Sequence, residues 1–344
     1  MKKRSVVRRM GAAGLAVLFF TLSCASWEQR NEVSALRGSY NYQFYKRHPR
    51  DFKLTTVAHW AHGKASEILL EKPRDPAEAD QALYDKALWF LGHPPETEPH
   101  QDYVSPQFAR QAWRAIQVID WTHQLHEQLY DILADPAIPV GEKKKWIDRA
   151  VDYYLSEPSM AFSPAPFEEV IMSRVRLTSQ PWFMAFRDDW KLTSKMFWAF
   201  HWWHPAVYEV QMLFPGADEQ KRAIEAIDDL FLDRVLKEPP NRMLLSREVM
   251  PRFARLSPEA ANIFDNLHMF HGITYDILAS AEVKDKRAEV YRNIDLMLVR
   301  PGDRRLAGNF PTPVPEVDPL AYSKDMRQGP GEMGRIMGHG HHGH

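Results

Sequence analysis

Hydrophobic positions along the chain recur at the spacing of helices rather than strands. Four amphipathic runs stand out, over residues 76–91, 141–155, 217–236 and 283–299. Each run ends near a proline of the kind that stops helices, namely Pro94, Pro158, Pro239 and Pro301. Short β-branched stretches such as residues 170–175 are flanked by charge and do not alternate cleanly. The pattern therefore predicts an all-α protein.

A His-x-x-His motif precedes each of these runs. The four copies start 64, 78 and 67 residues apart. Random placement of the histidines would give fewer than about one such pair. The repeating unit is thus a motif helix followed by an amphipathic helix, and four tandem helical hairpins are predicted. The motif histidines are His59, His62, His123, His126, His201, His204, His268 and His271.

The residues around the motif alternate between repeats. The second and fourth copies share an aspartate three positions before the first histidine, Asp120 and Asp265. The first and third copies share a tryptophan directly after it, Trp60 and Trp202. This alternation indicates that a two-hairpin unit was itself duplicated. We therefore expect pseudo-two-fold symmetry, with the site on the axis.

The motif spacing suits metal binding. Residues three apart on an α-helix lie about 60° from each other on one face, so both imidazoles of a motif point the same way. Each neutral imidazole has two nitrogen atoms that need partners, and each one missed costs about 1–3 kcal/mol. Eight inward histidines therefore predict metal ligands, with Asp120 and Asp265 as further ligands or hydrogen-bond acceptors. A structural or pH-sensing role for the histidines is the alternative.

The ligand types bear on the choice of metal. Cys24 is the only cysteine, which excludes disulfides and, with the signal removed, a thiolate site in the folded domain. Imidazole-rich sites suit copper, iron or zinc, and the aspartates and tyrosines favour copper or iron. Eight imidazoles exceed one four-coordinate ion, so two or three transition metal ions are expected. Haem b held between two histidines is the alternative cofactor.

Two further positions of the repeat carry chemistry. The residue seven after the first histidine lies within about 20° of it on the helix. Three of these are tyrosines that we expect to act in catalysis by donating a hydrogen bond or an electron, Tyr130, Tyr208 and Tyr275. The fourth is the smaller Ser66, which predicts a substrate pocket beside Ser66 and Trp60. The next residue is always acidic, and we expect hydrogen bonds between helices or to imidazoles from Glu67, Asp131, Glu209 and Asp276.

The two ends of the chain have a different composition. Residues 1–23 combine a basic start with a short apolar run, which predicts an export signal, and Cys24 stands where bacterial lipoproteins are lipidated. Cleavage without lipidation is the alternative. Residues 24–50 are predicted to form an arm on the bundle, 51–300 the helical domain, and 301–344 a Pro/Gly-rich tail with a His/Met-rich end. A periplasmic protein, anchored to the membrane by lipid on Cys24, is expected.

The composition also limits the function. The 44 basic and 45 acidic side chains nearly cancel, which argues against a nucleic-acid partner. Gly-x-Ser-x-Gly, phosphate-loop and dinucleotide glycine motifs do not occur in the sequence. We expect an exported, redox-active multi-metal protein of the oxidase or electron-transfer type, with a small-molecule substrate or a redox partner. Metal storage or delivery is the main alternative, and haem b binding the second.

Overall fold

The protein is helical throughout its described part. The computed structural model describes residues 43–95, 100–311, 314 and 316–322, and no β-strand occurs among them. The one strand-like feature there is an isolated bridge between Phe162 and Leu298. Residues 170–175 fall within η1, a π-helical segment spanning Glu168–Val175. The prediction of an all-α protein is confirmed.

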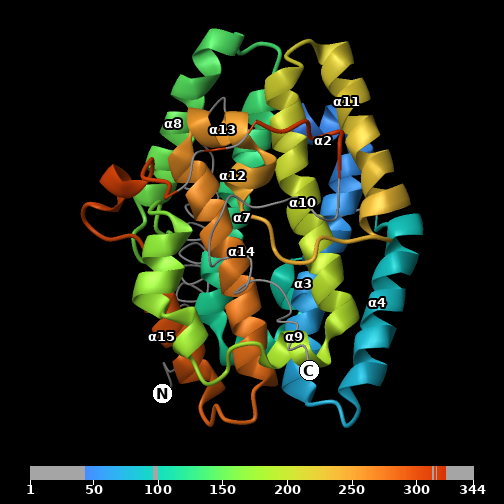
Figure 1. Ribbon diagram of the computed structural model, residues 1–344, viewed down its shortest axis with the longest axis vertical. Helices are drawn as coiled ribbons and strands as arrows, with labels where there is room; N and C mark the ends of the chain where they lie inside the picture. Colours follow the sequence, from blue (N-terminus) through green and yellow to red (C-terminus); the bar gives the residue numbers. More distant parts are fainter. Residues whose placement is uncertain (1–42, 96–99, 312–313, 315, 323–344) are drawn as a thin grey trace, which may run out of the picture.

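The four motifs lie on the four longest helices. These helices run side by side through the middle of the molecule (Figure 1). Within this group α3 packs against α14, and α7 packs against both α10 and α14. The four helices are α3 (Pro49–Glu71), α7 (Trp113–Ala134), α10 (Lys191–Leu213) and α14 (Pro258–Ala279).

A second helix follows each motif helix and packs against it on the outside of the bundle. In Figure 1, α8 and α15 flank one side of the central helices, and α11 and α4 flank the other. Helices occupy all four of the predicted amphipathic runs. They are α4 (Pro76–Gly92), α8 (Val140–Leu155), α11 (Ala217–Leu230), which η3 (Phe231–Val235) continues, and α15 (Lys286–Met297).

A short helix leads into each motif helix. The four are α2 (Gln43–Arg47), α6 (Pro106–Gln111), α9 (Ala185–Asp189) and α13 (Pro251–Leu256). Two other one-turn helices, α5 (Gln101–Val104) and α12 (Ser246–Val249), precede α6 and α13. One or two turns are too short to show a hydrophobic period, so the sequence pattern did not predict them. The 3₁₀ turns η2 (Leu177–Ser179) and η4 (Asp303–Leu306) complete the described helices.

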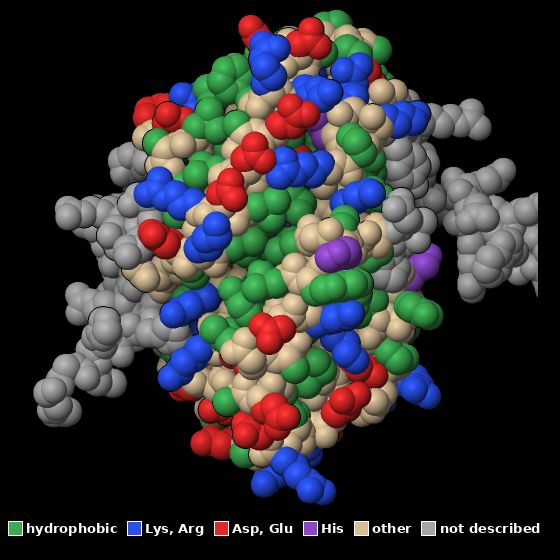
Figure 2. All heavy atoms as spheres, turned by 90° about the vertical axis from the view of Figure 1, so that its right-hand side faces the viewer, with side chains coloured by type: hydrophobic (Ala, Val, Ile, Leu, Met, Phe, Trp, Pro, Cys, Tyr) green, Lys and Arg blue, Asp and Glu red, His purple; other side chains and the backbone are tan. Residues whose placement is uncertain are grey.

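Two of the inner helices, α10 and α14, are buried on nearly all sides. In α10, every residue from position 196 to 211 is buried, including Phe200, Trp202 and Trp203. A helix that is apolar all round belongs in the interior of a protein. Figure 2 shows one face of the molecule, on which positive and negative side chains are intermixed with hydrophobic ones. That distribution agrees with the nearly balanced charge of the chain.

The ends of the chain are only partly described. The predicted signal, Cys24 and the His/Met-rich end lie outside the described residues. Of the predicted arm, Phe44 is buried and stacks on Tyr130 with ring centroids 4.4 Å apart. The described start of the predicted tail also packs on the body, since Asp303 pairs with Arg174 and the buried Tyr322 donates a hydrogen bond to the carbonyl oxygen of Glu238. None of the described helices is both long and apolar enough to span a membrane.

Candidate metal centre

All eight motif histidines lie in one internal cluster. Seven are buried, and His123 is partly exposed. Each ring has a close neighbour from another motif helix. The ring centroids are separated by 4.0 Å in His59–His123, 4.1 Å in His201–His268, 4.5 Å in His62–His271 and 5.1 Å in His126–His204. Contacts of 5.8 Å for His62–His201 and His123–His271 and 6.5 Å for His59–His204 join these pairs.

Several imidazole nitrogen atoms in the cluster have no hydrogen-bond partner among the described residues. They are both ring nitrogens of His201, both of His271 and Nε2 of His204, and all are buried. Each unpartnered buried polar atom costs about 1–3 kcal/mol, and native proteins keep few of them. These five atoms belong to three neighbouring histidines, so a ligand bound here would have several free nitrogens to pair with.

Burial keeps these imidazoles neutral. It lowers the pKa of six of them well below the usual value of histidine, and neighbouring histidines lower it further. Burial lowers the pKa of His268 to about 3. A neutral imidazole retains the lone pair that binds a metal. The six are His62, His123, His126, His201, His204 and His271.

Three of the four close ring pairs are stacked, whereas His126 and His204 meet edge to face at 69°. The planes of His59 and His123 differ by 16°, and those of His62 and His271 by 17°. Within the described residues, no group of three or more His, Cys, Asp or Glu side chains is arranged so that it could hold a metal ion as it stands. Metal binding here therefore requires the rings to turn about their side-chain bonds until their nitrogens face a common point.

The three tyrosines differ in what they contact. Tyr130 donates a hydrogen bond to the carbonyl oxygen of His204, at 2.9 Å, and Tyr208 donates one to that of His126, at 2.8 Å. Both therefore hold α7 and α10 together. The Tyr275 hydroxyl instead lies 2.7 Å from Nδ1 of His62 and 3.3 Å from the carbonyl oxygen of that residue. Tyr275 is thus the tyrosine that makes direct contact with an imidazole nitrogen of the cluster.

The acidic residue eight positions after the first histidine of each motif is expected to bond to another helix or to an imidazole. In the structure it bonds to another helix. In all four copies its carboxylate accepts a hydrogen bond from a backbone N–H at a short helix that leads into another motif helix. The donors are Phe108 to Glu67, Phe44 to Asp131, Phe253 to Glu209 and Phe186 to Asp276. The expectation of contacts between helices is confirmed, but the partners are short helices whose free N–H groups favour an anion.

The phenylalanines in these contacts mark a further position of the repeat, one that hydrophobic periodicity does not reveal. Each is buried and lies 15 residues before the first histidine of its motif. The constant offset is visible in the sequence, but a lone phenylalanine outside an amphipathic run carries no periodic signal. The repeated phenylalanine becomes visible when the alignment of the four copies is extended to the residues before each motif.

The two predicted aspartate ligands are not equivalent, contrary to expectation. Asp265 is buried and accepts a hydrogen bond from the Ser246 N–H at 2.7 Å, and burial raises its pKa to about 7. Asp120 is exposed. The two positions therefore differ in their surroundings, because α12 covers Asp265 whereas Asp120 is exposed on α7.

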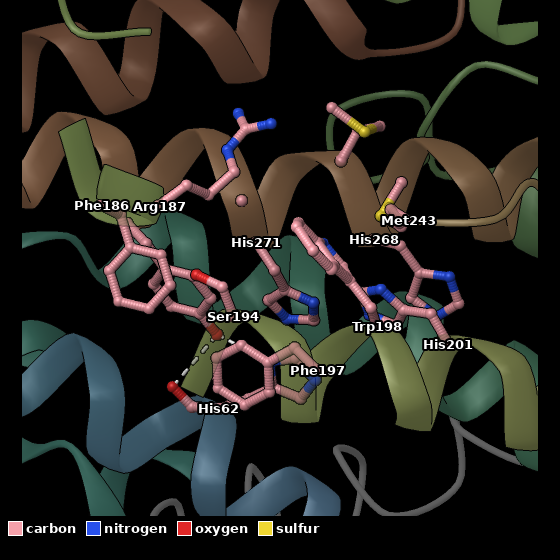
Figure 3. Close-up of a pocket in the computed structure, with 13 residues that line it drawn as sticks. His62, Phe186, Arg187, Ser194, Phe197, Trp198, His201, Met243, His268 and His271 are labelled. Carbon is pink, nitrogen blue, oxygen red and sulfur yellow. Dashed lines mark hydrogen bonds between the residues drawn. The ribbon is translucent and has the colours of Figure 1, made fainter. Parts of the chain in front are cut away.

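A cavity adjoins the cluster, but not on the predicted side. Its volume is about 40 Å³, and its walls include His62, His201, His268 and His271 (Figure 3). Neither Ser66 nor Trp60 lines it. The small α5 and α6 pack against α3, and Ser66 is buried there. This cavity is therefore not the pocket predicted beside Ser66 and Trp60.

Replacing Asp276 with asparagine tests the contacts of the acidic residues. Asp276 is fully buried and pairs with Arg187 at 2.7 Å, so Asp276→Asn leaves a buried guanidinium without its countercharge. We expect the free energy of unfolding, measured in guanidinium chloride, to fall by about 3 kcal/mol. The control is Asp295→Asn, because the Arg114–Asp295 pair is largely exposed. That change should cost less than about 1 kcal/mol, and equal losses would contradict the assignment.

Comparison with known proteins gives no assignment. No protein family, no curated protein and no solved structure matches this chain.

Proposed function

We propose that the protein binds two or three transition metal ions through the eight motif histidines, and that the centre is redox-active. The observation that carries the proposal is the set of buried imidazole nitrogens without partners among the described residues, in His201, His204 and His271. Neutral imidazoles of this kind are ligands for copper, iron and zinc. Asp265 stays a candidate for an outer partner, whereas the exposed Asp120 is not part of the proposed site.

We also propose that the chain consists of four copies of one hairpin, related by pseudo-symmetry around the cluster. The contacts between copies support this. First histidines pair between copies one and two and between copies three and four, and the carboxylate contacts follow the same pairing. Second histidines pair between copies one and four and between copies two and three, as do the tyrosine contacts. Each copy thus contacts one neighbouring copy through its first histidine and a different copy through its second. This pattern is expected of repeats arranged about a common centre.

Tyr275 is the residue that we propose for redox chemistry. Burial raises the pKa of its phenol well above the usual value, so the hydroxyl stays protonated. A phenol that gives up an electron must also release its proton, and Nδ1 of His62 is within hydrogen-bond reach at 2.7 Å. Tyr130 and Tyr208 bond to backbone carbonyls, and for them we propose a positioning role.

Metal content and an optical spectrum test the proposal. Protein purified from its native compartment should contain at least two metal ions per chain by elemental analysis. A ligand-to-metal charge-transfer band would identify copper or iron, whereas a metal-loaded protein without visible absorption would favour zinc and remove the redox proposal. Purified protein that neither contains nor takes up copper, iron or zinc would contradict the function altogether.

Metal storage or delivery is the second candidate. The burial of seven of the eight histidines favours it, because a store saturates its ligands and needs no open position. Turnover by the loaded protein separates the two, since a store has none. Haem b is the third candidate, and the cavity of about 40 Å³ favours metal ions over a flat macrocycle.

The proposed location rests on the sequence of the N-terminus. The basic and apolar residues before Cys24 support export to the periplasm, and the cysteine supports a lipid anchor. Mass spectrometry of the native N-terminus tests both, since lipidation would add diacylglycerol at Cys24.

A further inference from the structure

The most exposed residue in the lining of the cavity beside the cluster is a glycine. Thirteen residues line the cavity, and twelve of them are buried. The exception is Gly272, which is partly exposed and lies on α14 directly after His271. Figure 3 shows His271, His201 and His268 grouped around the same space, with Phe197 and Trp198 beside them.

The wall of the cavity contains unpartnered polar atoms. Ser194 is 2% exposed, and its hydroxyl has no hydrogen-bond partner among the described residues. The ring nitrogens of His201 and His271 also have none there. A cavity of about 40 Å³ has room for two or three atoms the size of water. A small polar ligand could therefore accept a hydrogen bond from Ser194 and reach the imidazoles.

The missing side chain of Gly272 leaves space free at the edge of the cavity. A Cβ atom built at this position meets nothing within 4 Å, and the backbone there does not have a positive φ. Neither close packing nor backbone conformation thus requires glycine, although glycine costs about 1 kcal/mol relative to alanine inside a helix. Free space beside the histidines is a physical reason for a glycine at this point of α14.

We propose that this cavity binds a small exogenous ligand of two or three non-hydrogen atoms that accepts a hydrogen bond. The ligand passes Gly272, accepts the hydrogen bond of Ser194 and coordinates the centre beside His201 and His271. The proposal rests on the proposed metal function and adds an open coordination position to it. It favours a catalytic centre over a closed store.

Azide is the probe for this site. Metal content of the full-length protein is measured first, and azide is then titrated into the metal-loaded protein by calorimetry. We expect wild type and Gly272→Ala to bind azide, and Gly272→Leu to bind it at least about tenfold more weakly, because leucine fills the opening while the metal content is unchanged. Ser194→Ala should weaken binding about threefold to tenfold through the lost hydrogen bond.

The matched control is Gly92→Leu at the end of α4, where a Cβ atom also meets nothing within 4 Å. It should bind azide as wild type does. Should Gly272→Leu fail to fold, Gly272→Val takes its place with a smaller side chain. Equal azide affinity in wild type and the filled variant, or a metal-loaded wild type that binds no azide, overturns the proposal and leaves the metal function intact. A wild type that contains and takes up no metal overturns both.

Discussion

Replacing His271 with leucine is expected to remove at least one metal ion per chain, or to weaken its binding by more than about 100-fold. The loss of an outer partner alone lowers metal affinity about 10- to 100-fold, and a direct ligand should count for more. In the metal-free protein the same variant should be as stable as wild type or more stable. The reason is that both nitrogens of His271 are buried without partners among the described residues, so leucine removes an uncompensated desolvation cost. Elemental analysis and guanidinium unfolding measure the two quantities.

The control for this variant is His93→Leu. His93 is exposed at the end of α4, outside the motif helices, so the metal content should not change. The opposite result, unchanged metal with a stability loss of about 2 kcal/mol or more in the metal-free His271→Leu protein, would show that His271 is a structural residue of the core.

Lowering the pH is expected to unfold the metal-free protein between about pH 6.5 and 5. Seven motif histidines have folded-state pKa values lowered by burial, whereas in the unfolded chain they titrate near 6.5. Below that pH the unfolded state binds more protons, so stability falls as the pH falls. Three buried carboxyl groups have an opposite effect on stability. Burial raises the pKa of Asp51, raises that of Asp228 to about 6 and raises that of Asp265 to about 7, so the folded state holds more of these protons. More histidines than carboxyl groups are shifted in this way, so the net slope is a loss of stability as the pH falls.

Guanidinium unfolding followed by circular dichroism from pH 7.5 to 5 measures this slope. Replacing His271 with leucine should reduce it by about 1.4 kcal/mol per pH unit. Loading with metal should shift the loss of stability to lower pH, because bound imidazoles resist protonation. A pH-independent stability over this range would mean that the histidines are not buried in neutral form.

The local geometry of the site was predictable from the sequence. The spacing of His201 and His204 puts both rings on one face of a helix whatever lies around it, because the rotation per residue is a property of the backbone. The same holds for the amphipathic runs that became α4, α8, α11 and α15. Because the motif is repeated four times, the sequence also predicted that the four histidine-bearing helix faces have similar surroundings.

The contacts between copies were decided by the tertiary structure. Nothing in the sequence pairs His59 with His123 rather than with His268, since the pairing depends on which helices lie side by side. Asp120 and Asp265 occupy the same position of the repeat, yet only Asp265 is covered, because α12 donates the Ser246 N–H to it.

The position of the cavity was also decided by the tertiary structure. The small side chain of Ser66 predicted unfilled volume beside it, but Ser66 is buried and does not line the cavity next to the cluster. The free space lies instead at Gly272, where nothing packs within 4 Å of the missing Cβ. Sequence determines the direction and the volume of each side chain on its own helix. Which volumes are then filled depends on segments far away in the chain, and only the packed structure brings these together.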